Sequence, residues 1–237
     1  MKTRNLIVVL GILISNSSWL TADNRSYVWT YEYQTMQRGE AEIEHYTTIT
    51  SPFADSLKGT VTTEHNIEVE VGMNDRFDFS VYQNFKQIPD GSLEYTGYKL
   101  RARYRLGEKG LYPVDPLLYF EYKGKPDFSE HSLEGKLILA RDFGNLNIAI
   151  NPVFEMEYED DNWKSEVKYN AGARFIVNSL FKAGIEMRSS ETGTYFGPTV
   201  SHGSERFWFA IGTLYAISEV DNGKPEFMLR LILGIGL

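Results

Sequence analysis

The amino-acid sequence predicts an all-β protein, namely a transmembrane antiparallel up-and-down β-barrel of about 12 strands, with 10 or 14 strands as alternatives. Three observations predict this fold. Apolar and polar residues alternate almost without a break from about residue 40 to the end, the alternating runs are long, and the last run is apolar on one face up to the final residue. Strict alternation places successive side chains on opposite faces of a strand.

Residues 1–22 have the layout of a secretory signal peptide. Lys2 and Arg4 precede the short apolar stretch LIVVLGILI, and a polar stretch leads to a predicted cleavage site near Ala22. An N-terminal membrane anchor is the alternative. Removing residues 1–22 takes away these two cations and no acid, so the net charge changes from −8 to −10. Such an acidic chain without a basic tract argues against nucleic acid as a partner.

Residues 23–39 precede the first alternating run. They could enter the lumen, pair at the periplasmic rim or form a further strand, and the sequence leaves these alternatives open. Residues 40–237 are predicted to form the barrel itself. The absence of cysteine from the whole sequence excludes a lipoprotein anchor, disulfides and a thiolate metal site.

The run YKLRARYRLG, residues 98–107, shows the alternation most clearly. Lys99, Arg101, Arg103 and Arg105 occupy every second position, with tyrosine, leucine and alanine between them. One face of this strand is therefore basic and the other apolar. In a membrane barrel the basic face turns to the lumen and the apolar face to lipid.

Similar runs separated by turn residues predict twelve strands. Most have ten or more residues, about twice the usual length of roughly 5–6 in soluble proteins and enough for the roughly 9–11 tilted residues that cross a bilayer. The predicted ranges are 40–50, 60–73, 77–87, 97–106, 116–124, 131–143, 145–159, 164–178, 180–189, 194–203, 206–218 and 226–237.

The last run, EFMLRLILGIGL, is the most specific single feature. Its apolar face runs from Phe227 to Leu237, and its other face carries Arg230 and glycines. An exposed apolar edge strand at the end of a soluble chain would promote aggregation. A barrel that closes on its last strand has no such edge.

These features together resemble the bacterial outer-membrane β-barrels, over the whole chain. Turns such as VGMNDRFDFS are similar to the periplasmic hairpins of that group. The segment QRGEAEIEHY and the hairpin that follows it more narrowly resemble the transporters grouped with the phenol-degradation MetA-pathway proteins. The resemblance implies an outer-membrane location and a role in transport.

A soluble β-sandwich also alternates apolar and charged residues. The long strands, the export signal and small residues on the charged face favour the membrane barrel. The small residues on that face, where a barrel interior needs room, are Gly72, Gly172, Gly184, Gly212 and Gly236.

Parity assigns many charged residues to the lumen. The basic ones are Lys99, Arg101, Arg103, Arg105, Lys168, Arg174, Arg188 and Arg230. The acidic ones are Glu42, Glu44, Glu64, Glu68, Glu70, Glu155, Glu157, Glu166 and Glu186. These charges either line a narrow pore or pair across the bore and fill it, since about 12 strands lie between filled and open barrels.

We therefore expect passage of small solutes through a narrow charged lumen. A non-conducting structural or surface-interaction barrel is the alternative, and a lipid-modifying enzyme is a third. Expected partners are outer-membrane lipids and lipopolysaccharide, the barrel-assembly machinery during insertion, and small solutes. Orientation by parity places the C-terminus and the short turns such as 73–76 in the periplasm, and loops such as 125–130 outside.

Catalytic and metal-binding residues are not expected. His202 lies near Ser201 and Ser204, but Ser–His chemistry requires the hydroxyl within hydrogen-bond reach and a third group to orient the imidazole. His45, His65 and His131 have no ligand spacing that would indicate zinc, and no acidic loop has the pattern of a calcium site. We expect neither a cofactor nor a catalytic site.

Overall fold

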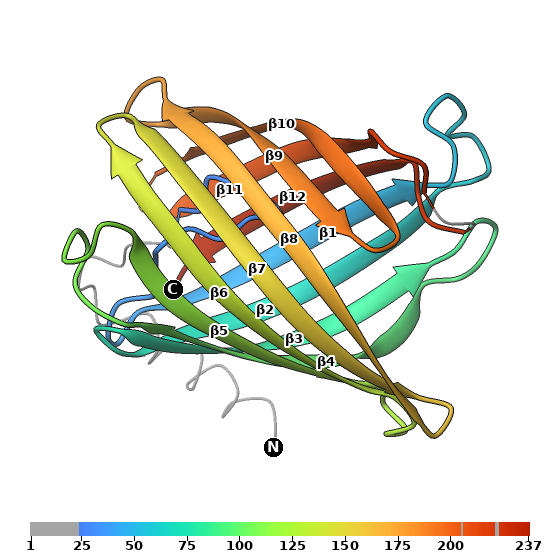
Figure 1. Ribbon diagram of the computed structural model, residues 1–237. Helices are drawn as coiled ribbons and strands as arrows, with labels where there is room; N and C mark the ends of the chain where they lie inside the picture. Colours follow the sequence, from blue (N-terminus) through green and yellow to red (C-terminus); the bar gives the residue numbers. More distant parts are fainter. Residues whose placement is uncertain (1–23, 205, 221–222) are drawn as a thin grey trace, which may run out of the picture.

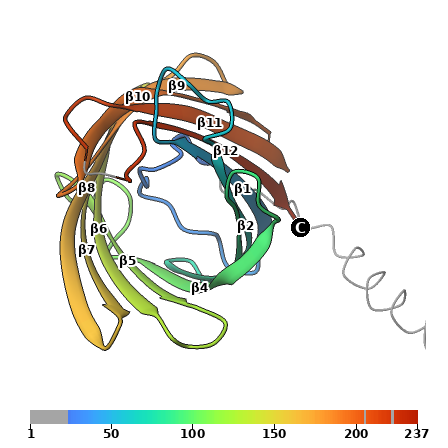
Figure 2. The ribbon, with the colours of Figure 1, turned by 90° about the vertical axis from the view of Figure 1, so that its right-hand side faces the viewer.

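The structure, a computed structural model, describes residues 24–204, 206–220 and 223–237. These residues contain no helix, and none of them therefore forms a helix long and apolar enough to cross a membrane. They form twelve strands in one closed barrel (Figures 1 and 2). The strands are β1 Ala41–Ser51, β2 Thr62–Asn74, β3 Phe77–Gln87, β4 Glu94–Arg105, β5 Asp115–Gly124, β6 His131–Phe143, β7 Leu146–Glu159, β8 Asn162–Ile176, β9 Phe181–Ser190, β10 Gly193–Gly203, β11 Phe207–Ala216 and β12 Phe227–Gly236.

Each strand pairs antiparallel with its neighbours in sequence, and β1 closes the barrel on β12. The closing ladder runs from the pair Glu42 and Gly236 to the pair Ser51 and Phe227. Closure leaves no strand edge to pair with another chain. The predicted fold class and the prediction of twelve strands are both confirmed.

Two strands, β8 and β4, begin two or three residues earlier than predicted. The turn between β7 and β8 needs only Asp160 and Asp161, whose φ angles of 51° and 60° are those of a type I′ turn, so the hairpin extends to the pair Glu159 and Asn162. Strand β4 begins at Glu94 because its pairing with β3 continues past a bulge. Asn84 pairs with Gly97, and after the register shift Phe85 pairs with Tyr95.

Alternate residues of each strand face opposite sides of the wall. On β7, Ile150 and Phe154 are exposed on the outer side, whereas Asn151 and Val153 between them are buried on the inner side. The outer surface therefore carries an apolar belt, as the lipid-facing side of a transmembrane barrel does.

The two ends of the barrel differ in their connections. We call the end with Leu237 and the connections after β2, β4, β6, β8 and β10 the turn end. We call the opposite end, with the connections after β1, β3, β5, β7, β9 and β11, the loop end.

Candidate functional site in the barrel lumen

Residues 24–40, which we call the inner segment, enter the barrel from the turn end and return to it. Asn24 donates through Nδ2 to the carbonyl of Ser204, 3.3 Å away, and Gly39 donates its N–H to the carbonyl of Gly72, 2.9 Å away. Between these points the segment forms neither helix nor strand, and its chain lies inside the ring of strands (Figure 2). Its tip is formed by residues 28–31.

The side chain of Glu186 on β9 holds this tip. Its carboxylate accepts the backbone N–H groups of Val28, Trp29 and Thr30 at 2.8, 2.9 and 2.7 Å. Glu186 is only 1% exposed, so these three bonds replace the water that its charge would otherwise require. The bonds also satisfy three donors of a segment that has no regular structure of its own.

Further residues of the barrel wall bind the rest of the inner segment. Asn151 on β7 accepts the N–H of Tyr31 at 2.6 Å and donates to its carbonyl at 3.1 Å. Asp78 on β3 accepts the N–H of Met36 at 2.9 Å. Arg174 on β8 pairs with Glu32 at 3.2 Å, so the two ends of the segment and its tip are all tied to the wall.

Inward-facing glycines make room for the segment. A Cβ on Gly172 would lie 2.6 Å from the Tyr27 ring, and one on Gly212 would lie 2.7 Å from Val28. The small residues that the sequence places on the lumen face at these two positions therefore accommodate the chain's own inner segment.

A cluster of buried ion pairs fills the lumen beside β2, β3 and β4. Arg101 binds Glu68 at 2.8 Å and also pairs with Glu70, while Arg103 pairs with Glu70 and binds Asp78 at 2.7 Å. All five side chains are at most 3% exposed. Separating one partner from such a cluster would leave a buried charge without compensation, which is energetically costly. The ion pairs therefore keep these side chains in place.

Tyrosines extend this cluster to the inner segment. Tyr82 accepts a hydrogen bond from Arg101 at 2.7 Å, and Tyr46 donates to Glu68 at 2.8 Å. Tyr46 also accepts a hydrogen bond from Arg25 of the inner segment at 2.8 Å. The middle of the bore is therefore occupied by packed polar side chains.

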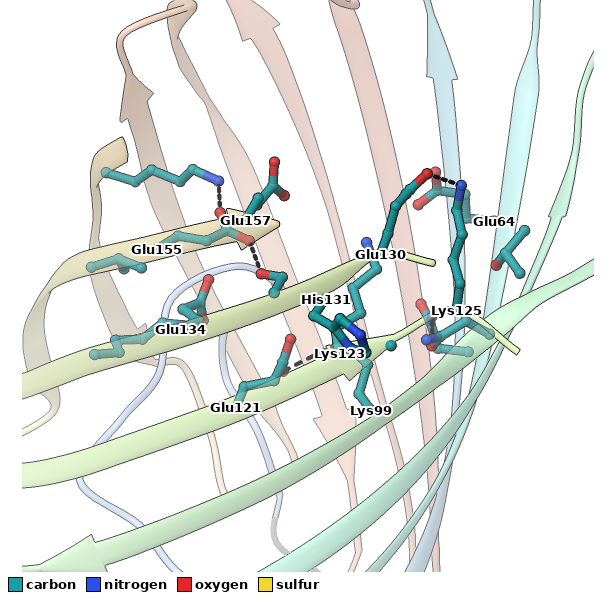
Figure 3. Close-up of a pocket in the computed structure, with 18 of the residues that line it drawn as sticks. Glu64, Lys99, Glu121, Lys123, Lys125, Glu130, His131, Glu134, Glu155 and Glu157 are labelled. Carbon is teal, nitrogen blue, oxygen red and sulfur yellow. Dashed lines mark hydrogen bonds and ion pairs between the residues drawn. The ribbon is translucent and has the colours of Figure 1, made fainter. Parts of the chain in front are cut away.

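A cavity of about 590 Å³ lies between this filled zone and the loop end. Carboxylates and ammonium groups of neighbouring strands point into it (Figure 3). Its lysines are largely paired, as in Lys99 with Glu121 at 3.2 Å and Lys136 with Glu134 at 3.0 Å. Trp29 and Tyr31 of the inner segment belong to its lining, so the tip forms part of its inner end.

A second cavity of about 510 Å³ lies at the turn end. Residues 33–38 of the inner segment line it together with Asp75, Arg105 and Lys109. The inner segment thus lines both cavities.

The structure places the predicted lumen residues in four settings. Arg101, Arg103, Glu68 and Glu70 form the buried cluster, with Glu42 and Glu44 buried on β1. Arg174 and Glu186 hold the inner segment. Lys99, Lys168, Arg188, Arg230, Glu64, Glu155 and Glu157 line the loop-end cavity, with Glu166 bound to Lys168, and Arg105 lines the turn-end cavity.

The predicted lumen residues do not include several residues that line or hold the site. Asn151 and Asn170 are uncharged, and Glu121, Glu134 and Lys136 lie on β5 and β6, from which no lumen residue is predicted. The same alternation that predicts strands β5 and β6 also places these last three residues inward, so the signal was present.

His202 shows no Ser–His arrangement. His202 is exposed and stacks on Phe209 with ring centroids 5.7 Å apart, whereas Ser201 is buried on the other face of β10. Within the part of the chain that the structure describes, no group of three or more histidine, aspartate or glutamate residues is arranged to hold a metal ion.

Comparison with known proteins identifies the fold. No protein-family model and no curated protein sequence matches the chain. Among solved structures, the KdgM porin in complex with disordered oligogalacturonate is similar with a TM-score of 0.57 at 8% identity, over 82% of this chain and 97% of that chain. The NanC porin is similar with a TM-score of 0.53 at 12% identity, over 82% and 98% of the two chains. The chain therefore has the fold of the outer-membrane β-barrel porins.

Proposed function

We propose that this protein is an outer-membrane barrel that lets small hydrophilic solutes pass through a narrow charged lumen. The observation that carries the proposal is the pair of cavities, one toward each end of the barrel, both lined by the inner segment. The fold shared with porins and the resemblance to transporters grouped with the MetA-pathway proteins support the same role.

The proposal includes location and orientation. The apolar outer belt suits lipid, and the chain from about residue 23 would reach the outer membrane after signal-peptide cleavage near Ala22 and insertion by the assembly machinery. The loop end would face outward, toward lipopolysaccharide, and the turn end the periplasm. A solute would enter the loop-end cavity and leave past a displaced inner segment.

Charge near the tip favours anionic solutes. Arg188 and Arg230 line the loop-end cavity, and neither pairs with a carboxylate of the described residues, whereas the cavity's acidic residues face several lysines. An unpaired cation attracts an anion more strongly than a paired one does, because no neighbouring charge cancels its field.

A non-conducting barrel is the second candidate. The buried cluster of Arg101, Arg103 and their acidic partners favours it, because charges that pair across the bore fill it. Such a barrel would act through its surface and its loops.

Single-channel recording in a planar bilayer tests the two candidates. We expect small conductance steps from the refolded chain and larger, longer steps after deletion of residues 25–36. Deletion of residues 55–58 in the exposed connection after β1 is the control and should leave the steps unchanged. Silence from all three correctly folded proteins would contradict passage and favour the non-conducting barrel.

A further inference from the structure

Two arginines at the inner end of the loop-end cavity differ from most of the cavity's lysines. Lys99, Lys136 and Lys168 each lie within ion-pair distance of a carboxylate. Arg188 and Arg230 have no such partner in the described ranges, and their like charges act on each other. This end of the cavity therefore carries positive charge that the wall does not neutralise.

The two arginines are not equivalent. Arg230 donates to the Thr48 hydroxyl at 2.9 Å and to the Val28 carbonyl at 3.1 Å, and its guanidinium lies 5.4 Å from the centre of the Trp29 ring. Its position is thus fixed by protein contacts. Arg188 forms no hydrogen bond with the residues that the structure describes, which leaves the donors of its guanidinium available to a ligand.

Two buried polar atoms in the lining of this cavity also lack a partner among the described residues. They are the indole Nε1 of Trp29 and the amide Oδ1 of Asn170, in side chains only 4% and 9% exposed that line the same cavity. Asn170 is the direct register partner of Arg188 across β8 and β9, and its Nδ2 donates to the Trp29 carbonyl at 3.4 Å. Unsatisfied donors and acceptors that are this deeply buried are rare and indicate a site for another polar group.

We propose that Arg188, Asn170 and Trp29 form a binding site for a small hydroxycarboxylate. The carboxylate would accept hydrogen bonds from the planar guanidinium of Arg188, an arrangement that is stronger than a neutral bond. A hydroxyl group of the ligand would accept from Trp29 Nε1 and donate to Asn170 Oδ1, which satisfies both atoms at once. Arg230 would add positive charge without changing its own contacts.

The remainder of the cavity limits the ligand to a small monoanion. Its lining includes seven carboxylates, which would repel additional negative charge: Glu64, Glu121, Glu130, Glu134, Glu155, Glu157 and Glu159. The volume of about 590 Å³ falls within the roughly 300–1,000 Å³ of ordinary small-ligand sites. A dianion such as phosphate would be attracted more strongly by Arg188, but the carboxylates of the cavity would also repel it more strongly.

The site deepens the proposed passage function and rests on it for its biological meaning. Because Trp29 belongs to the inner segment, the site is complete only while the tip is held by Glu186. Binding itself can be measured without any current through the barrel, so a failure of passage and a failure of binding are separate results.

Nuclear magnetic resonance of the ¹⁵N-labelled full chain in detergent micelles provides a direct test. The indole signal of Trp29 is identified by its loss in Trp29→Phe. We expect D-gluconate to shift it, and the neutral polyol sorbitol to leave it unchanged. The indole of Trp208, which already donates to Glu42 at 2.5 Å, is the internal control and should not move.

Variants separate a binding role of Arg188 from a structural one. Arg188→Gln should weaken gluconate binding by about ten-fold or more, since it removes a charge-assisted hydrogen bond, and Arg188→Lys should restore part of the loss. Lys86→Gln, which removes another cation of the same cavity, should stay within about two-fold of the unmodified chain.

Trp29→Phe tests the hydroxyl contact. Ligand binding to this variant can be followed through the signal of the Asn170 backbone amide. The variant should bind gluconate roughly five-fold more weakly, and its affinity for acetate, which has no hydroxyl, should be unchanged. Equal shifts with gluconate and sorbitol, the absence of any shift at Trp29, or undiminished binding to folded Arg188→Gln would each overturn the proposal.

Discussion

Replacing Glu186 with glutamine should release the inner segment from the lumen. The carboxylate of Glu186 accepts three backbone N–H groups, two of them through Oε2, from Trp29 at 2.9 Å and Thr30 at 2.7 Å. A glutamine side chain has one acceptor oxygen, which can take the Oε2 position and keep the N–H groups of Trp29 and Thr30, but its NH₂ group then faces the N–H of Val28. One bond is then lost, and the other two no longer go to a charged acceptor.

The free energy that the substitution costs follows from the type of hydrogen bond that it removes or weakens. A hydrogen bond to a charged group contributes about 1.5–3 kcal/mol and a neutral one about 0.5–1.5 kcal/mol, so one lost bond and about 1 kcal/mol from each of the two weakened bonds amount to roughly 3–5 kcal/mol. We use the lower figure because bonds within one network are not additive. About 3 kcal/mol corresponds to an increase of roughly 150-fold in the fraction of molecules whose tip has left its seat.

Cysteine labelling measures this fraction directly. The sequence contains no cysteine, so Thr30→Cys introduces a single thiol at a position that is 1% exposed. We expect a water-soluble maleimide to label it on the order of 100-fold faster when Glu186→Gln is added. Longer open times in single-channel recordings should accompany the faster labelling.

The matched control is Glu166→Gln on the adjacent strand β8. Glu166 binds Lys168 at 3.2 Å in the loop-end cavity wall and is not among the residues that hold the tip. It should leave the labelling rate nearly unchanged. Equal labelling rates in the Glu186→Gln and Glu166→Gln backgrounds, both folded, would refute the assignment of Glu186 as the anchor of the tip.

Two further predictions concern the inner and outer faces of the wall. Gly172→Val should push against the Tyr27 ring, since even a Cβ there would lie 2.6 Å away, and should accelerate labelling of the same thiol; Gly135→Val, with open space around it, should not. Ile150→Arg, in the middle of β7 on the outer face, should cost about 2–4 kcal/mol of folding free energy in vesicles, against about 0–1 for Phe143→Arg at a strand end. Equal costs at these two positions would contradict the proposed membrane depth.

The barrel could be predicted from the sequence because its signal is local and repeated. Alternation defines each strand and its two faces, and turn residues separate the strands, so the twelve predicted ranges agree closely with those observed. The differences arise where local turn geometry decides, as with Asp160 and Asp161, whose positive φ angles lengthen a hairpin by a few residues.

The path of residues 24–40 could not be predicted in the same way. The segment has no periodicity, and its partners are far away in sequence: Glu186 lies 158 positions from Val28, and Asn151 lies 120 positions from Tyr31. One indirect signal existed. Glycines on the lumen face of long strands indicate that something must fit against them, but they do not say whether it is solvent, a solute or the chain itself.

The roles of the lumen arginines also depend on strand register. Glu70, Ser80 and Arg101 lie in line across β2, β3 and β4, and the small side chain of Ser80 lets Arg101 reach over it to Glu70. A row of arginines on one strand therefore looks like an open basic wall in the sequence, while two of its members are buried in ion pairs.

The number of charges on the lumen face is consequently a poor measure of the charge that a solute would meet. A buried ion pair such as Arg103 with Asp78 has its field largely cancelled by its partner, and it occupies space that a solute would need. Arg188 and Arg230 have no such partner in the described part of the chain, and they line a cavity. We therefore expect selectivity to depend on these two side chains at the tip of the inner segment far more than on the arginines of β4.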